Sequence, residues 1–284
     1  MDKQDVLKLE QFALEIRLNA VKSLDNLGFG HYGGALSIVE TLAVLYGKVM
    51  NVDPKNPAWD GRDYFILSKG HAGPALYSAL ALKGYFPLDT LMTLNKNGTK
   101  LPSHLDRILT PGVDMTSGSL GQGISVATGI AKAIKQNGTD QMVYCIVGDG
   151  ELNEGQCWEA VQFAVQHELD NLIIFVDDNK KQLDGTVEEI SGKKDFAKIF
   201  EAFGFSAKDV CGKDVAGIYD AIIDAQTKKG KPHVIVLDTL KGQGFTYLEG
   251  KKDNHHLRPN ADEVVIIKDY IAELEKELGV LKNA

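Results

Sequence analysis

Two polar side chains follow two short apolar runs in the middle of the chain. Met142–Val147 stops at Gly148-Asp149-Gly150, and Leu172–Val176 stops at Asp177-Asp178-Asn179. The carboxylate of Asp149 and the amide oxygen of Asn179 are ligands that a hard divalent cation prefers, with water and a phosphate group completing its shell. These residue types therefore predict a metal-bridged phosphate site, provided that the fold brings the two residues together.

The sequence between the two runs explains how they could meet. Each run has the length and β-branched content of a buried strand, and Gly155–Glu168 repeats apolar residues at helical spacing. A strand–helix–strand unit places the carboxyl ends of its parallel strands at one edge of the sheet. Gly148 and Gly150 let the backbone approach a phosphate closely, and the helix beginning near Gly155 offers free N–H groups. We therefore expect a diphosphate site at this edge.

Two other phosphate-binding motifs are excluded by the residues themselves. A dinucleotide fingerprint needs a third glycine three positions after Gly150, and Asn153 stands there. The phosphate loop of nucleotide hydrolases needs Gly-Lys followed by Ser or Thr, and no Gly-Lys pair of this chain is followed by either. An ordinary strand–helix–strand unit with glycine turns stays open at this point.

Most histidines lie in predicted loops or at junctions between elements; these are His31, His71, His104, His255 and His256. Imidazole donates, accepts and moves protons near neutral pH, so this set suits chemistry on a polyhydroxylated substrate. Zinc binding is the alternative, but no pair has helical ligand spacing and no cysteine accompanies the set. His167 and His233 are interpreted as structural.

Composition narrows the classes of partner. The chain of 284 residues carries 31 basic and 39 acidic residues, for a net charge of −8, which argues against nucleic acid or an anionic membrane surface. It has no apolar run of membrane-spanning length, and its first residues lack a signal-peptide core. Cys145, Cys157 and Cys211 are predicted to be buried thiols in a reducing compartment, so we expect a cytoplasmic location.

The remaining sequence alternates predicted helices and strands, which is typical of one α/β domain with a parallel sheet. Lys241–Asn260 is predicted as a loop too long and polar for a plain connection, hence functional, and Gln182–Gly192 as a second loop. The other expected elements are helices at Val6–Leu27, Ile38–Val49, Ile124–Lys135, Phe196–Phe203, Val215–Lys228 and Ala261–Leu278, a helix ending at Leu82, and strands at Asp63–Leu67 and His233–Asp238.

Six short motifs stand in a fixed order along the chain. They are Gly30-His31-Tyr32-Gly33-Gly34, Leu67–Ala72, Ser103-His104, Gly118–Gly123, Gly148-Asp149-Gly150 with Glu154-Gly155, and Asp177–Asn179 with Asp184-Gly185. The fifth and sixth together resemble the thiamine diphosphate signature, and the whole series resembles the amino-terminal half of a transketolase. The resemblance implies a thiamine diphosphate-binding fold, with a parallel sheet flanked by helices on both faces.

The resemblance also implies roles for individual residues. Asp149, Asn179 and the backbone carbonyl of Lys181 would hold Mg²⁺, or Ca²⁺ or Mn²⁺ in its place. The residues implied to contact the diphosphate of thiamine diphosphate are His71, Gly148, Gly150 and one late histidine. Gly118 and Leu120 would contact its aminopyrimidine. Glu154 would be the cofactor-site carboxylate that the family uses to link two active sites, with Glu159 as a second candidate.

The reacting carbons would be surrounded by His31, His71, His104 and His255, which would also bind sugar hydroxyls. The resemblance favours His255 over His256 as the late histidine, and both residues remain candidates. Tyr32 and Ser103 depart from the family, which often has proline and glycine at these positions. Such departures leave cofactor binding intact and put the donor and acceptor range in doubt.

The activity implied is transfer of a two-carbon ketol unit from a ketose phosphate to an aldose phosphate, as in the pentose phosphate pathway. In the family a second domain supplies the glutamate that activates the cofactor and the arginines for the substrate phosphate. We expect residues 1–284 to form only the diphosphate-binding (PP-type) domain. The pyrimidine-binding and carboxy-terminal domains would lie on a separate chain, giving an α2β2 heterotetramer.

Three alternatives remain at this stage. The first is a transketolase subunit for an unusual sugar phosphate or a sulfosugar. The second is the alpha subunit of a thiamine-dependent 2-oxoacid dehydrogenase, which should lack the set His31, His71 and His104. The third is a non-catalytic subunit, and the intact Asp149 and Asn179 argue against it.

Overall fold

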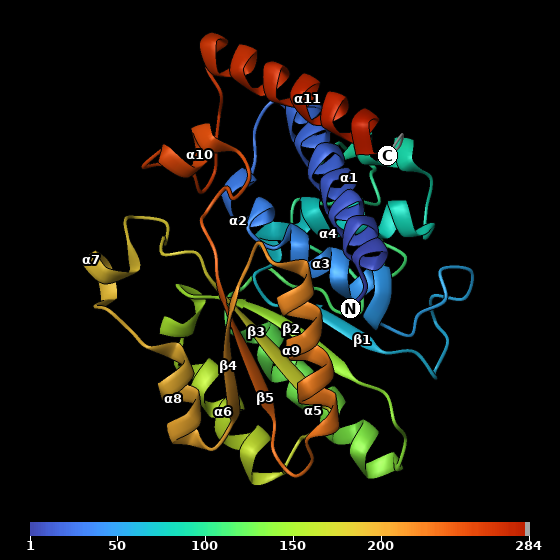
Figure 1. Ribbon diagram of the computed structural model, residues 1–284, viewed down its shortest axis with the longest axis vertical. Helices are drawn as coiled ribbons and strands as arrows, with labels where there is room; N and C mark the ends of the chain where they lie inside the picture. The colour runs from blue at the N-terminus through green and yellow to red at the C-terminus, as the bar shows by residue number, and fades with distance from the viewer. Residues whose placement is uncertain (282–284) are drawn as a thin grey trace.

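A parallel sheet of five strands forms the centre of the molecule (Figure 1). The computed structural model describes residues 1–281, so the last three residues of the predicted domain lie outside the described part. Every neighbouring pair of strands runs parallel, and all carboxyl ends therefore lie at one edge. In the order of the sheet, the strands are β1 (Tyr64–Leu67), β2 (Val143–Gly148), β3 (Leu172–Asp178), β5 (His233–Asp238) and β4 (Ser206–Cys211).

Helices cover both faces of the sheet, because alternate strand residues point to opposite sides. On β2, Tyr144 and Ile146 join one apolar core, whereas Cys145 and Val147 join the other. The first core includes side chains of α1 (Lys3–Leu27), α2 (Tyr32–Leu36), α3 (Val39–Val44), α4 (Gly73–Lys83), α9 (Val215–Thr227) and α11 (Ala261–Leu281); the second includes side chains of α5 (Gln122–Asn137), α6 (Gly155–Gln166) and α8 (Phe196–Phe203). The predicted fold class is confirmed, and Figure 1 shows α11 lying along α1 at the top of the view.

Polar caps explain where several helices begin and end. The Asp2 carboxylate accepts a hydrogen bond from the N–H of Asp5 at 2.8 Å and starts α1. The helix stops at Gly28, whose φ of 83° lies in the left-handed region that glycine enters without strain. At α9, the carboxylate of Asp214 caps the N–H groups of Ala216 and Gly217.

One strand and several short helices differ from the prediction. β4 was not expected, because most of its side chains are polar and lie partly or fully exposed on the last strand of the sheet. Cys211, at the end of β4, is exposed rather than buried. The predicted helix Ile38–Val49 divides into α3 and a π-helical turn, η1 (Leu45–Val49). The predicted loops contain α7 (Val187–Ser191) and α10 (Thr246–Gly250), and α2 forms directly after His31. Short 3₁₀ helices form at η2 (Gly70–Ala72), η3 (Leu88–Thr93) and η4 (Glu151–Asn153).

Within residues 1–281, no helix combines the length and the apolar character needed to cross a bilayer.

Candidate active site

Asp149 and Asn179 lie together at the carboxyl edge of the sheet. Gly148 at the end of β2 pairs with Asp177 of β3, so the residues that follow both strands emerge side by side. The carboxylate of Asp149 accepts hydrogen bonds from the N–H of Gly150 at 2.7 Å and from the N–H of Lys180 at 2.7 Å. Lys180, between Asn179 and Lys181, has a φ of 69°, a left-handed conformation that is uncommon outside glycine and gathers at functional sites.

The oxygens at this edge suit a hard divalent cation. The amide nitrogen of Asn179 donates to the carboxylate of Asp177 at 2.6 Å, and its amide oxygen accepts from the N–H of Lys181 at 3.2 Å. This leaves the second lone pair of that oxygen for another group. Burial raises the pKa of Asp149 to about 7, with a further contribution from the charge of Asp177, and a bound cation would relieve both effects. The carbonyl of Lys181 has a second lone pair beyond its contact with the Lys241 ammonium. A carboxylate, an amide and a carbonyl oxygen fit Mg²⁺ chemistry.

No group of three or more His, Cys, Asp or Glu side chains suited to a metal ion occurs in the described part of the chain. The set formed by Asp149, Asn179 and the Lys181 carbonyl contains one such side chain, so it is a different kind of site.

A buried ion pair fixes the end of β3. The carboxylate of Asp177 accepts from the ammonium of Lys69 at 2.6 Å, and both side chains are essentially inaccessible to solvent. Three further donors reach the same carboxylate: Ser37 at 2.7 Å, Thr239 at 2.6 Å and Asn179 at 2.6 Å. Burial alone would raise the pKa of Asp177, but Lys69 and the hydrogen bonds hold it below its usual range. Asp177 thereby orients Asn179 and joins four chain segments.

A second buried carboxylate holds the loops on the other side of β2. Glu151 accepts from the Ser68 hydroxyl at 2.5 Å, from the N–H of Gly121 at 2.8 Å and from the N–H of Gly148 at 3.0 Å. These three donors belong to the loop after β1, the start of α5 and the end of β2. A side chain at Gly123 would lie 2.5 Å from the Cα of Ser68, so the close approach requires glycine.

The five histidines predicted in loops form one cluster above this edge. The ring of His31 lies 5.5 Å from that of His71, 5.6 Å from His104, 5.2 Å from His255 and 4.8 Å from His256, measured between centroids. His71 and His255 are 4.8 Å apart. The loops meet because Gly30 and Leu257 exchange backbone hydrogen bonds of 2.9 and 2.8 Å. A Cβ at Gly34 would lie 2.9 Å from Nε2 of His71, so glycine makes room for that ring.

Burial and neighbouring cations favour the neutral imidazole. The pKa of His31 falls to about 4, through burial first and then the charges of His256 and His104. The pKa of His255 falls to about 3, through burial and then Lys241. Burial also lowers the pKa of His71 and of His104. These four rings are therefore neutral near pH 7, able both to donate and to accept hydrogen bonds.

Lys241 joins the cluster to the strand edge. Its ammonium lies 3.0 Å from Nδ1 of His255 and donates at 3.2 Å to the carbonyl oxygens of Lys181 and Gln182. Burial lowers its pKa to about 8, although the charge of Asp149 opposes that shift. A cation thus lies beside the predicted diphosphate position, where an anion would be stabilised.

The histidine cluster makes stability depend on pH. An unfolded chain protonates His31 and His255 near pH 6.5, whereas the folded chain holds their pKa values at about 4 and about 3. Between pH 6.5 and 4 the unfolded state therefore binds more protons, and the free energy of unfolding falls as the pH falls. His71, His104, His256, Lys69 and Lys241 face the same space. We expect a combined slope on the order of 1 kcal/mol per pH unit, reduced by residual solvent contact.

Urea unfolding of the chain at pH 6.5, 6.0, 5.5 and 5.0 measures that slope. The variant His31→Asn/His255→Asn should show a clearly flatter dependence over this range. Equal slopes for the two proteins would contradict the assignment of neutral buried rings.

Comparison with known proteins identifies the architecture. The family model for the transketolase thiamine diphosphate binding domain matches residues 9–279. The chain is 46% identical over 277 residues to the SqwG subunit of the 6-deoxy-6-sulfo-D-fructose transketolase of a Clostridium species, covering 98% of this chain and 99% of that protein. It is 42% identical over 258 residues to one subunit of the apulose-4-phosphate transketolase of Actinobacillus succinogenes, covering 90% and 93%.

The chain belongs to the transketolase family. Longer members show the same correspondence over part of their length. The transketolase of Pongo abelii is 35% identical over 274 residues, which are 95% of this chain and 43% of that protein. The solved transketolase of Campylobacter jejuni superposes with a TM-score of 0.86 at 29% identity, covering all of this chain and 48% of that one. The chain is thus the thiamine diphosphate-binding domain of a transketolase, and thiamine diphosphate is its cofactor.

The other predicted cofactor residues of this transketolase domain lie around the same edge. Gly118 lies beside His104, since a Cβ there would be 3.5 Å from the Cβ of His104. Leu120 is half-buried, and Glu154 and Glu159 are exposed, which leaves both carboxylates open to a second chain. His256, less favoured than His255 on the sequence, also belongs to the cluster, and its ring faces His31 and Phe29.

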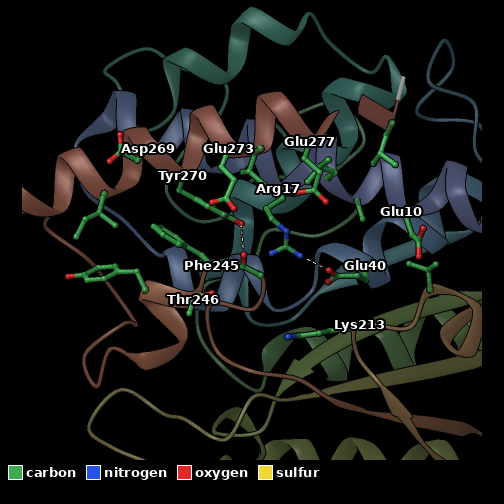
Figure 2. Close-up of a pocket in the computed structure, with 18 residues that line it drawn as sticks. Glu10, Arg17, Glu40, Lys213, Phe245, Thr246, Asp269, Tyr270, Glu273 and Glu277 are labelled. Atoms are coloured by element: carbon green, nitrogen blue, oxygen red, sulfur yellow. Dashed lines mark hydrogen bonds and ion pairs between the residues drawn. The ribbon is translucent and has the colours of Figure 1, made fainter. Parts of the chain in front are cut away.

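A groove of the described molecule lies apart from this site. It is a groove of about 730 Å³ between α1, α11 and the residues before α10. Figure 2 shows Arg17 reaching Glu40 and the hydroxyl of Tyr270 turned toward the loop of Phe245. None of the described lining residues is a histidine or a predicted cofactor residue. The residues predicted to do chemistry therefore lie at the strand edge and not in this groove.

Sequence reasoning missed the residues that hold the site together. Lys241 begins the predicted loop Lys241–Asn260, whereas Lys69, Glu151 and Asp177 stand inside or beside the six motifs, which assign no role to them. Their signal was a charged residue within an otherwise small or apolar motif, which is expensive to bury unless it is paired.

Proposed function

We propose that this chain is the cofactor-binding subunit of a two-chain transketolase. With a partner chain it moves a two-carbon ketol unit from a ketose phosphate to an aldose phosphate, using thiamine diphosphate and Mg²⁺. The observation that carries this proposal is the cluster of neutral histidines, which Lys241 links to the carbonyl of Lys181, the residue that follows Asn179 by two positions. A site for a cation and a diphosphate beside several imidazoles that can transfer protons favours catalysis on a sugar over ligand binding alone.

The residues of this chain would have separate roles in holding the metal, facing the diphosphate and binding the sugar. When bound, thiamine diphosphate would supply a carbon nucleophile and an electron sink for cleavage of a C–C bond. Asp149, Asn179 and the Lys181 carbonyl would hold Mg²⁺, while the ammonium of Lys241 and the ring of His71 would face the diphosphate. His31, whose ring lies next to the other four, and His104, which is exposed, would bind sugar hydroxyls and move their protons. Such proton transfer typically contributes on the order of 10²–10⁴ in rate.

The partner requirement rests on two observations. Two similar proteins of matching length are named as subunits, and the chain corresponds to less than half of two longer transketolases. We propose that the pyrimidine-binding and carboxy-terminal domains come from a second chain, in an α2β2 assembly, with Glu154 and Glu159 at the contact between subunits. The three free cysteines support a reducing compartment such as the cytoplasm.

Reconstitution tests the proposal. The chain alone should show no ketol transfer, because the groups that activate the cofactor lie on the partner. The chain that co-purifies from the source cell, added with Mg²⁺ and thiamine diphosphate, should restore transfer from a ketose phosphate to an aldose phosphate. Ketol transfer by the lone chain would refute the two-chain proposal. A reconstituted pair that binds the cofactor but transfers nothing to any aldose would refute the reaction.

A sulfosugar donor is the second candidate. It is favoured by the 46% identity to a subunit named for 6-deoxy-6-sulfo-D-fructose, whereas the 42% identical relative is named for apulose-4-phosphate. The same reconstituted pair should be compared on fructose 6-phosphate and 6-deoxy-6-sulfofructose. A kcat/KM at least roughly tenfold higher on the sulfonate, about 1.4 kcal/mol in transition-state binding, would identify the sulfosugar as the donor, and the reverse ratio would exclude it.

A further inference from the structure

The side chain of Lys181 crosses from one loop of the site to another. Its ammonium donates to the carbonyl oxygen of Lys251 at 2.9 Å and to that of Glu249 at 3.3 Å. These acceptors lie at the end of α10 and directly after it, far away in the sequence. The backbone of Lys181 faces elsewhere: it forms an isolated bridge with Thr186, and its carbonyl belongs to the candidate metal set.

A second ammonium joins the same two segments. Lys241 donates to the carbonyl oxygens of Lys181 and Gln182 and contacts Nδ1 of His255. His255 follows Lys251 by only a few residues. Segments 181–182 and 249–255 are therefore linked twice, once through the side chain of Lys181 and once through that of Lys241.

The other side of segment 249–255 is anchored independently. Lys251 donates to the carboxylate of Glu263 on α11 at 2.7 Å, and the amide of Asn254 donates to the carbonyl oxygens of Lys241 and Leu248, both at 2.8 Å. We call residues 179–182, which include Asn179 and the Lys181 carbonyl, the metal loop. Loss of the Lys181 ammonium would thus weaken the contact of segment 249–255 with the metal loop, while the segment stays attached to α11. Hydrogen bonds from a charged donor are stronger than neutral ones, so this link is large enough to measure.

We propose that Lys181 is a positioning residue, whose ammonium holds segment 249–251 against the metal loop so that the metal ligands and His255 are ordered together. The inference rests on the proposed function, since it takes the Lys181 carbonyl as a metal ligand and His255 as an active-site histidine. Its consequence is that cofactor affinity depends on a side chain that need not touch the cofactor.

Amide hydrogen exchange of the full chain, followed on a peptide covering residues 249–257, tests the link without any cofactor. Lys181→Met should exchange on the order of tenfold faster in this peptide, because one charge-assisted interaction is lost. Lys181→Arg retains the donor and should stay close to the wild type. Lys135→Met is the matched control: it removes an ammonium that donates to the carbonyl of Glu168 and contacts Asp170, and it should leave the peptide unchanged.

Calorimetric titration of the two-chain complex with thiamine diphosphate and Mg²⁺ tests the coupling. Lys181→Met should raise the Kd on the order of tenfold, with rescue by Lys181→Arg and no change for Lys135→Met. Wild-type exchange rates in Lys181→Met would overturn the link, and faster exchange with an unchanged Kd would overturn the coupling. If the wild-type complex binds no cofactor, the proposed function fails and the coupling fails with it, while exchange still reports on the link itself.

Discussion

Asp149→Asn is expected to weaken Mg²⁺-dependent binding of thiamine diphosphate on the order of 100-fold or more. Even residues that only support metal ligands cost roughly 10–100-fold when they are changed, and Asp149 is the only charged oxygen donor in the proposed set. Asparagine keeps the shape of the side chain but removes its charge. Titration of the reconstituted two-chain enzyme with thiamine diphosphate, at fixed and then at varied Mg²⁺, measures the loss.

The Asp149→Asn variant is expected to lose cofactor affinity while its folding stability stays nearly unchanged. Burial and then the charge of Asp177 raise the pKa of Asp149, so the folded protein disfavours the charged form of this side chain. Removing that charge offsets the loss of one backbone hydrogen bond, so the unfolding midpoint of the variant should stay close to that of the wild type. Asp238→Asn is the control, because this exposed carboxylate lies at the same sheet edge and pairs with Lys180. Cofactor affinity equal to the wild type in Asp149→Asn would refute the metal-site assignment.

Lys69→Met is expected to lower the free energy of unfolding by about 3–5 kcal/mol. Lys69 and Asp177 form a fully buried pair at 2.6 Å, and the Lys69 ammonium also donates to the carbonyl of Gly34 at 2.7 Å. Removal of the cation leaves a carboxylate buried without its counter-charge, which costs far more than the pair itself contributes. Urea unfolding at pH 7 measures the change in the free energy of unfolding. The dependence of that free energy on urea concentration should be equal for the variant and the wild type.

Two further variants test the reason for that loss. Lys69→Met/Asp177→Asn removes both charges and should recover part of the stability, because no uncompensated charge remains. Lys22→Met breaks a surface pair with Glu275 of the same 2.6 Å length and should cost no more than about 1 kcal/mol. A loss below about 1 kcal/mol for Lys69→Met would show that the buried pair carries little stability.

The sequence determined the central strands and the residues that follow them. Met142–Val147 and Leu172–Val176 are nearly continuous apolar runs, and strands buried on both faces require that pattern. Parallel pairing then brings Asp149 beside Asn179 whatever the rest of the fold does. The loop histidines could likewise be located, since a polar residue at a junction of elements interrupts the local pattern.

Other features were decided by the tertiary structure. β4 has a weak local pattern, and it forms as a strand only because β5 offers its open edge. The partnership of Lys69 with Asp177 joins the loop after β1 to the end of β3, and no periodicity in the sequence relates the two residues. Tertiary contacts also place His256 and Lys241 in the site. Their positions depend on the pairing of Gly30 with Leu257 and on contacts between distant loops. Local patterns specify which segments become strands and helices, whereas the partners of buried charges follow from how those segments pack.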